Sequence, residues 1–144
     1  MNKKVVIIEA ISESLDLPGI LLKSIFSRPV IQIVTDQIQR SARVDDFVVL
    51  TSESSADQEL AEYCSSKGIQ VHRSGADSLL ESYHDAARQF LADTVIRVQG
   101  NSPLLEPTLI DAMLGSFDRK ADYYSNCQPV RTVPLGQDLS LIHI

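Results

Sequence analysis

Two polar segments of the sequence hold the residues that could do chemistry. The first runs from Ala10 to about Ser24 and contains serines, carboxylates, a glycine and a lysine. The second is the short stretch from Gln99 to Pro103, with a glycine and an asparagine near its centre. A loop of roughly 15 residues in a compact domain usually has a function. We therefore predict that these two segments form a ligand site.

The histidines and cysteines offer no competing centre. His72, His84 and His143 lack the spacing of zinc ligands. Cys64 and Cys127 form no C-x-x-C motif, and we interpret them as reduced thiols without a catalytic role. A disulfide between the two cysteines is the alternative.

Short apolar runs predict the strands that precede the two loops. A continuous β-branched run such as Val5–Ile8 is typical of a strand buried on both faces of a sheet. The predicted strands are 5–8, 47–50, 69–71, 94–98, 123–125 and 139–144. Both loops leave the carboxyl ends of predicted strands, where open α/β sheets bind ligands.

Helical periods lie between these strands. The predicted helices are 29–40, 55–68, 77–91 and 107–117. In the third helix we expect Asp77 to cap the N-terminus and Leu80 and Leu91 to lie on the apolar face. The alternation of strands and helices predicts an α/β fold over residues 1–144 as a single domain. Its sheet is expected to be mostly parallel, covered by helices on both faces, with strand 5–8 at the centre.

The apolar segment Leu139–Ile144 ends the chain. An uncovered edge strand is prone to pair with another chain. We therefore expect a homodimer or larger homo-oligomer in which this segment is covered. We also expect the chain to be one piece of a longer architecture.

At the two loops the sequence resembles bacterial cytidylyltransferases. The stretch from Val6 to Gly19 resembles their first loop, approximately I-x-A-R-x-x-S-x-R-L-P-G-K. The stretch from Val98 to Pro107 resembles V-x-G-D-x-P-L-I-x-P, and the stretch from Gly75 to Ala87 resembles G-x-x-D-x-L-x-R-Y-x-x-A. The similar proteins include the CMP-Kdo and CMP-sialic acid synthetases and the spore-coat polysaccharide type.

The resemblance implies a Rossmann-like three-layer α/β/α nucleotidyltransferase fold of the nucleotide-diphospho-sugar transferase type. It implies transfer of CMP from CTP to a sugar acid with Mg²⁺ as cofactor, for surface polysaccharide or glycan biosynthesis. It also implies that the domain lacks a C-terminal portion usual in the family.

Site residues are assigned by the same resemblance. The nucleotide-binding positions are Ala10, Ser12, Ser14, Gly19, Lys23, Gln99 and Gly100. The metal-binding positions are Asn101 and Asp138, and no catalytic residue is assigned.

Several positions depart from the motifs. Ile11, Asp16 and Ile20 stand where the first loop of the family has two arginines and a lysine. Asn101 replaces a metal-binding aspartate, and Ser140 replaces the glutamate of a D-x-E pair. A phosphate needs several donors and positive charge. We therefore expect CTP to bind weakly or not at all.

Arg97 alternates with Ile96 and Val98 along a predicted strand. We interpret it as an ion-paired or edge-facing residue. Because it lies two residues before the second loop, a nucleotide contact is the alternative.

Composition limits the partners. The chain has 144 residues, is 44% hydrophobic and carries a net charge of −6. This charge argues against a nucleic-acid surface and against docking on an anionic membrane. No run approaches the 18 apolar residues of a membrane-spanning helix. We expect a cytoplasmic protein whose partners, if it is active, are CTP and a sugar acid.

Three functions follow from these observations. The one we favour is a catalytically impaired relative that keeps a binding or scaffolding role, with Mg²⁺ and CTP binding weakened or lost. The second is an active nucleotidyltransferase with a rearranged loop. The third is a glycosyltransferase of related architecture, which would need a D-x-D motif after a strand, and the sequence has none.

Overall fold

Six strands form one sheet in the computed structural model, which describes residues 2–118, 120–127 and 130–143. Their order is β5–β4–β1–β6–β8–β7. The strands are β1 (Lys4–Glu9), β4 (Asp46–Ser52), β5 (Val71–Ser74), β6 (Thr94–Gln99), β7 (Tyr123–Ser125) and β8 (Ser140–His143). The neighbouring strands β5, β4, β1 and β6 run parallel to one another, whereas β8 is antiparallel to both of its neighbours. The predicted central position of β1 and the mostly parallel sheet are confirmed.

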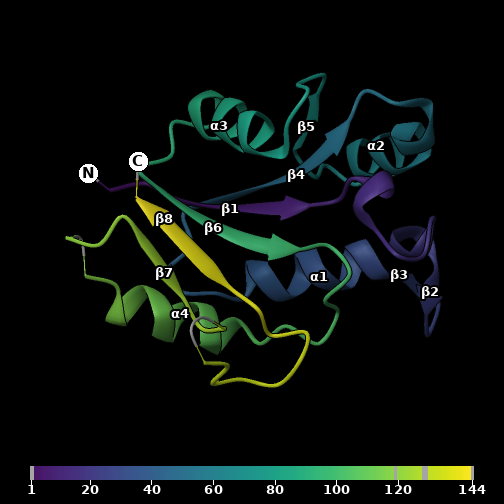
Figure 1. Ribbon diagram of the computed structural model, residues 1–144. Coiled ribbons are helices and arrows are strands. Elements are labelled where there is room, and N and C mark those ends of the chain that lie inside the picture. The colour runs from purple at the N-terminus through teal and green to yellow at the C-terminus, as the bar shows by residue number, and fades with distance from the viewer. Residues whose placement is uncertain (1, 119, 128–129, 144) are drawn as a thin grey trace.

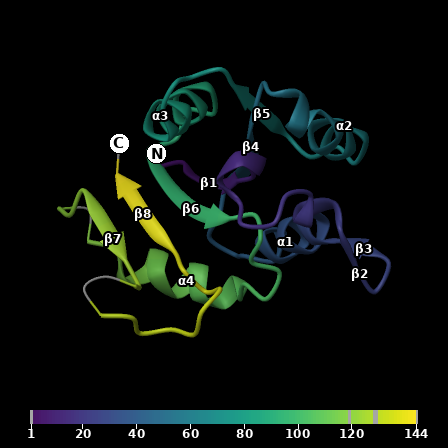
Figure 2. The ribbon, with the colours of Figure 1, turned by 45° about the vertical axis from the view of Figure 1, so that its right-hand side comes forward.

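Helices cover both faces of this sheet. One face packs against α1 (Val30–Gln39), α2 (Gln58–Ser66) and α4 (Pro107–Ser116). The other packs against α3 (Leu79–Gln89), which lies across the sheet from α1 and α4 (Figures 1 and 2). Successive side chains of a strand point to opposite faces, so Val6 and Ile8 enter the first core and Val5 and Ile7 the second. This is the three-layer α/β/α architecture that the sequence predicts.

The C-terminal strand is not an edge. The sequence prediction left Leu139–Ile144 uncovered, but β8 lies between β6 and β7, and the short strand β7 forms the edge. Leu139 and Leu141 are buried within this one chain. The argument for a homodimer through this strand is therefore wrong. Ile144 lies outside the described residues.

Two expectations for the third helix are also wrong. Ser78, not Asp77, caps α3, because its hydroxyl accepts a hydrogen bond from the Glu81 N–H at 3.2 Å. Leu80 and Leu91 are 77% and 78% exposed, respectively. The helix ends at Gln89, before Leu91, so the apolar periodicity extends past the helix that it predicts.

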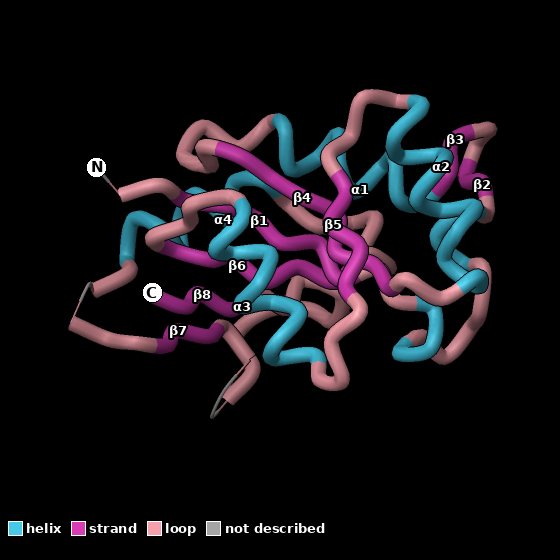
Figure 3. The backbone as a smooth tube through the Cα atoms, turned by 90° about the horizontal axis from the view of Figure 1, so that it is seen from above, coloured by secondary structure: helices cyan, strands magenta, loops and turns pink. Residues whose placement is uncertain are grey.

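The first predicted loop contains structure of its own. It includes the 3₁₀ turns η1 (Ser12–Ser14) and η2 (Ile20–Leu22). A small hairpin of β2 (Ser24–Ile25) and β3 (Arg28–Pro29) follows, apart from the main sheet (Figure 3). The sequence analysis missed this hairpin because two-residue strands carry no periodicity.

Candidate functional site

The candidate site lies at the carboxyl ends of β1, β4 and β6, which point to the same side of the molecule (Figure 1). The chain leaves β1 for β4 on one side and later returns to β6 on the other, so strand order reverses at β1. Open α/β sheets bind ligands at such a switch point. Both predicted loops begin here; the structure bounds the first at residues 10–23, before β2, and extends the second to residues 99–106, before α4.

The two loops touch at their origins. The Gly100 N–H donates to the Glu9 carbonyl at 2.8 Å. A Cβ at position 100 would lie only 2.8 Å from that same oxygen, so glycine is required for this close approach. Gln99 is exposed directly before it. The structure thus brings the predicted residues Gln99 and Gly100 to the start of the first loop.

The first loop uses several of its own donors within the protein. The Ala10 N–H donates to the Leu50 carbonyl at 2.8 Å, and Ala10 is fully buried. Gly19 has a φ of +76°, which explains a glycine at this turn. Lys23 is exposed at the end of the loop. Of the predicted nucleotide-binding residues here, Ala10 is a buried anchor, whereas Gly19 and Lys23 lie at the surface.

Asp57 fixes this loop to the sheet. It belongs to the turn η3 (Ser55–Asp57) before α2 and is fully buried. Its Oδ1 accepts hydrogen bonds from the N–H and hydroxyl of Ser12, the former at 3.1 Å. Its Oδ2 accepts hydrogen bonds from the N–H and hydroxyl of Ser52, at the end of β4, and the N–H lies at 3.1 Å. Asp57 therefore joins the first loop, a strand end and a helix start.

The charge of Asp57 follows from these contacts. Burial raises the pKa of its carboxyl, but the hydrogen bonds from Ser12 and Ser52 together lower it by more. The pKa of Asp57 therefore lies below its usual value. Asp57 is thus a buried anion beside the first loop. The N–H and the hydroxyl of Ser12 are both directed at this carboxylate. The sequence analysis missed Asp57 because its partner Ser12 is 45 residues away.

Glu9 forms a second buried carboxylate, on the opposite face of the sheet. Its Oε2 accepts hydrogen bonds from the Tyr83 hydroxyl at 3.0 Å, from Arg97 Nε at 3.1 Å and from Arg97 Nη2 at 2.9 Å. The Glu9 side chain is 10% exposed and that of Arg97 is 40% exposed. The ion-paired interpretation of Arg97 is confirmed, and its partner Glu9 was missed.

The surroundings of Arg97 favour its charged form. Partial burial lowers the pKa of Arg97, but the hydrogen bonds and charge of Glu9 raise it more, so the pKa is higher than usual. Burial, together with the Glu9 charge, raises the pKa of Tyr83, so its hydroxyl stays protonated and donates to Glu9. Arg97 is therefore a permanent cation whose charge is met by Glu9.

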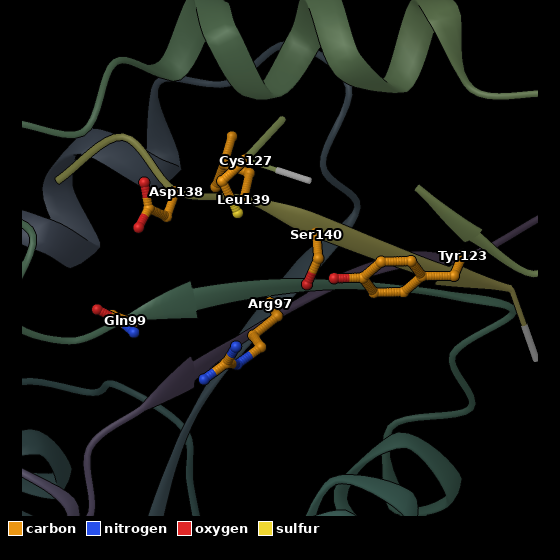
Figure 4. A pocket seen from close by; sticks show the side chains of 7 residues that line it. All are labelled: Arg97, Gln99, Tyr123, Cys127, Asp138, Leu139 and Ser140. Carbon is orange, nitrogen blue, oxygen red and sulfur yellow. The ribbon is translucent and has the colours of Figure 1, made fainter. Parts of the chain in front are cut away.

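Two small cavities lie beside the candidate loops. The first, of about 40 Å³, is lined by Arg97, Gln99 and residues of the segment that enters β8 (Figure 4). The second, of about 60 Å³, lies between the first loop and the start of α2. Ligand pockets are typically about 300–1,000 Å³. Neither cavity would hold a nucleotide without movement of its walls.

The predicted metal positions do not fit Mg²⁺. Asp138 forms a two-point ion pair with Arg131, in which Nη2 lies 3.0 Å from Oδ2, and these hydrogen bonds lower the pKa of Asp138. Asn101 is exposed and offers only an uncharged oxygen. Mg²⁺ usually binds one or two carboxylates together with substrate phosphates. No group of three or more His, Cys, Asp or Glu side chains able to hold a metal occurs among the described residues.

The second loop is held by Gln137, which the sequence analysis did not single out. Its Oε1 accepts the Glu106 N–H at 2.9 Å, and its Nε2 donates to the Leu104 carbonyl. A backbone clamp of this kind leaves no trace in the spacing of the sequence.

The two cysteines and the apolar character of the helices complete the description of the molecule. Cys64 and Cys127 are both free, and burial raises the pKa of the Cys64 thiol to about 11, which makes it a poor nucleophile. Within the part of the chain that the structure describes, no helix has the length and apolar character needed to span a membrane.

Comparison with known proteins identifies the relatives of this fold and site. A family model described as cytidylyltransferase matches residues 5–133. The spore coat polysaccharide biosynthesis protein SpsF of Bacillus subtilis is 29% identical over 128 residues, which cover 85% of this chain and 53% of that protein. A 3-deoxy-manno-octulosonate cytidylyltransferase of Acinetobacter baumannii is 30% identical over 149 residues, which cover 98% of this chain and 57% of that enzyme.

Solved structures agree. A cytidylyltransferase from Leptospira borgpetersenii superposes with a TM-score of 0.91 at 26% identity, covering 99% of this chain and 61% of that one. The chain thus spans about half the length of the curated relatives it matches.

Proposed function

Because the chain belongs to the cytidylyltransferase family, we propose that it is a cytidylyltransferase-like domain of surface polysaccharide or glycan biosynthesis whose CMP transfer is impaired. In the proposed family reaction, the hydroxyl oxygen of a sugar acid attacks the α-phosphorus of CTP. The bond from that phosphorus to the bridging oxygen breaks, pyrophosphate leaves, and the hydroxyl proton is lost to a base. The reaction depends mainly on positioning and on neutralising phosphate charge.

The charge at the carboxyl end of the sheet carries the proposal of impairment. Buried Asp57 places an anion against the first loop. Arg97, a cation at the switch point, is held by Glu9. Ile11 and Ile20 bring no charge, and two carboxylates, Glu13 and Asp16, lie in the same loop. A phosphate bound here would meet repulsion that the described contacts do not offset.

The relatives support the substrate class. One is named for spore coat polysaccharide biosynthesis and another for cytidylyl transfer to 3-deoxy-manno-octulosonate. Both relatives are about twice as long as the segment that matches this chain. We therefore give a sugar acid as the acceptor only as a proposal. We also propose that the protein binds CTP and Mg²⁺ weakly, is cytoplasmic and forms a homo-oligomer. The proposed nucleotide-binding positions include Ser14.

Pyrophosphate release tests the proposal. The protein is mixed with CTP, Mg²⁺ and a panel of sugar acids, and CTP binding is measured by calorimetry. We expect no release above background and a CTP dissociation constant far weaker than micromolar. The matched variant carries Ile11→Arg, Asp16→Arg, Ile20→Lys and Asn101→Asp together, and should gain Mg²⁺-dependent CTP affinity.

Two results would contradict the proposal. Release by the unmodified protein would establish the active alternative with a rearranged loop. A quadruple variant that folds but gains no CTP affinity would show that the crevice is not a nucleotide site.

A further inference from the structure

Arg97 is a cation at the switch point of the sheet, where an ion pair with Glu9 holds its side chain. It lies in register with Ile7 of β1, three residues before Gly100, and 40% of its side chain is exposed. Its Nε and Nη2 both face one oxygen of Glu9. We propose that Arg97 is a latent binding residue for phosphate groups and that Glu9 is the specificity-determining residue that keeps this site closed. The proposal rests on the proposed function, since it takes the crevice as a degenerate nucleotide site.

Arg97 has the chemistry of a phosphate ligand. A guanidinium presents a planar fork of donors that matches phosphate oxygens in a two-point contact. Here the fork is presented from the end of a strand in the centre of the sheet, next to the tight turn at Gly100. The half-exposed side chain also lines the small cavity shown in Figure 4, beside Gln99 and Ser140.

Glu9 keeps Arg97 from acting in this way. It is the last residue of β1, and its backbone is fixed between Leu50 of β4 and Gln99 of β6. Tyr83 of α3 binds the same carboxylate oxygen from the helical side. Glu9 therefore has little room to move aside. A phosphate that reached Arg97 would displace this ion pair and would lie against the Glu9 charge, which opposes binding.

The Glu9→Gln variant tests the idea. Glutamine keeps the shape of the side chain and an oxygen that can accept from Tyr83 and Arg97, but it removes the charge. The probes are inorganic pyrophosphate, CTP and cytidine, measured by calorimetry at low salt. We expect affinity for pyrophosphate and CTP to rise at least about tenfold, which equals about 1.4 kcal/mol. Cytidine, which has no phosphate, should show no change.

Three further variants separate charge from structure. Glu9→Asp keeps the charge and should show no gain. Tyr83→Phe removes a neutral partner of the same carboxylate and should also show no gain. Adding Arg97→Gln to Glu9→Gln should abolish the gain, and added salt should reduce it. A gain of similar size in Glu9→Asp or Tyr83→Phe, or a gain that survives Arg97→Gln, would overturn the proposal.

A measurement on the unmodified protein covers a failure of Glu9→Gln to fold. The nuclear magnetic resonance signal of the Arg97 Nε–H should not shift with millimolar pyrophosphate, because Glu9 holds that group. A shift that saturates at micromolar pyrophosphate would overturn the inference.

The two proposals fail in different ways. Pyrophosphate gain in Glu9→Gln with no binding of CTP or cytidine to any variant would support the latent site and contradict the cytidylyltransferase function. Tight CTP binding by the unmodified protein, with no further gain in Glu9→Gln, would overturn the latent site and favour the active alternative.

Discussion

Glu9 and Asp57 are both buried carboxylates at the carboxyl end of the sheet, but the protein stabilises them differently. Glu9 faces α3 and is held by a cation, Arg97, and by the Tyr83 hydroxyl. Asp57 faces the first loop and is held by four neutral donors from Ser12 and Ser52. The Glu9–Arg97 pair is therefore neutral, whereas the Asp57 cluster keeps a full negative charge.

This difference underlies our proposal that the crevice is poorly suited to phosphate. A buried carboxylate needs either an opposite charge or enough hydrogen bonds to replace water. At Glu9 that requirement engages the nearby arginine. At Asp57 it engages the N–H and hydroxyl of Ser12, in the loop where the family pattern implies phosphate contacts. Each solution stabilises the fold by using a group that we propose a nucleotide would otherwise contact.

Removing Asp57 should have the largest effect on stability. Asp57→Ala leaves the donors of Ser12 and Ser52 without their acceptor, and we expect the free energy of unfolding to fall by about 3 kcal/mol. Urea denaturation followed by circular dichroism measures this. The control Asp77→Ala changes an exposed aspartate and should stay within about 0.5 kcal/mol. A loss from Asp57→Ala no greater than that of the control would mean that the cluster adds nothing to stability.

Breaking the other cluster should cost less and should be recoverable. Arg97→Gln leaves Glu9 buried without its cation, and we expect a loss of about 2 kcal/mol in unfolding free energy. Adding Glu9→Gln should recover most of that loss, because no unpaired charge then remains. A double-mutant cycle by urea denaturation measures the coupling. If the losses of stability from Arg97→Gln and Glu9→Gln simply add, the ion pair between the two side chains does not contribute to stability.

Acid should act on the Asp57 cluster. Because the folded pKa of Asp57 lies below its ordinary value of 3.8, its contribution to stability is complete at higher pH and is lost as pH falls through the folded pKa. We expect this loss of stability to begin below about pH 4, near the ordinary pKa of an aspartate. The measurement is the urea midpoint of the protein and of Asp57→Asn between pH 6 and pH 3. Equal acid limbs for the two proteins would exclude Asp57 as the source.

A third buried polar group, the hydroxyl of Thr51, extends this comparison. Thr51 is fully buried, and its hydroxyl makes no hydrogen bond within the described part of the chain. Thr51→Val keeps the shape and removes this hydroxyl, so we expect a gain of up to about 1 kcal/mol in stability, measured as a higher melting temperature. Destabilisation would mean that the hydroxyl has a partner in solution, such as a water molecule.

Much of the fold could be predicted because it depends on local pattern. The run Val5–Ile8 is apolar on both sides of the strand, and only a sheet covered on both faces accommodates it. The Gln99–Gly100 turn follows a predicted strand, so its place at the carboxyl end of the sheet was also predictable. The interior position of β8 was not predictable, since its pairing with both β6 and β7 depends on contacts between distant segments.

The sequence by itself determined the layers of the sheet, the position of both loops and the loss of the family's charged side chains at Ile11, Asp16 and Ile20. Only the tertiary structure decided which charges meet. Arg97 pairs with Glu9, which is 88 residues away in the sequence, and Asp57 accepts hydrogen bonds from Ser12, which is 45 residues away. Burial sets the strength of a charge interaction, and burial is a property of the packed sheet and helices rather than of any local stretch of sequence. The electrostatics of the site therefore arise from packing, whereas its location follows from periodicity.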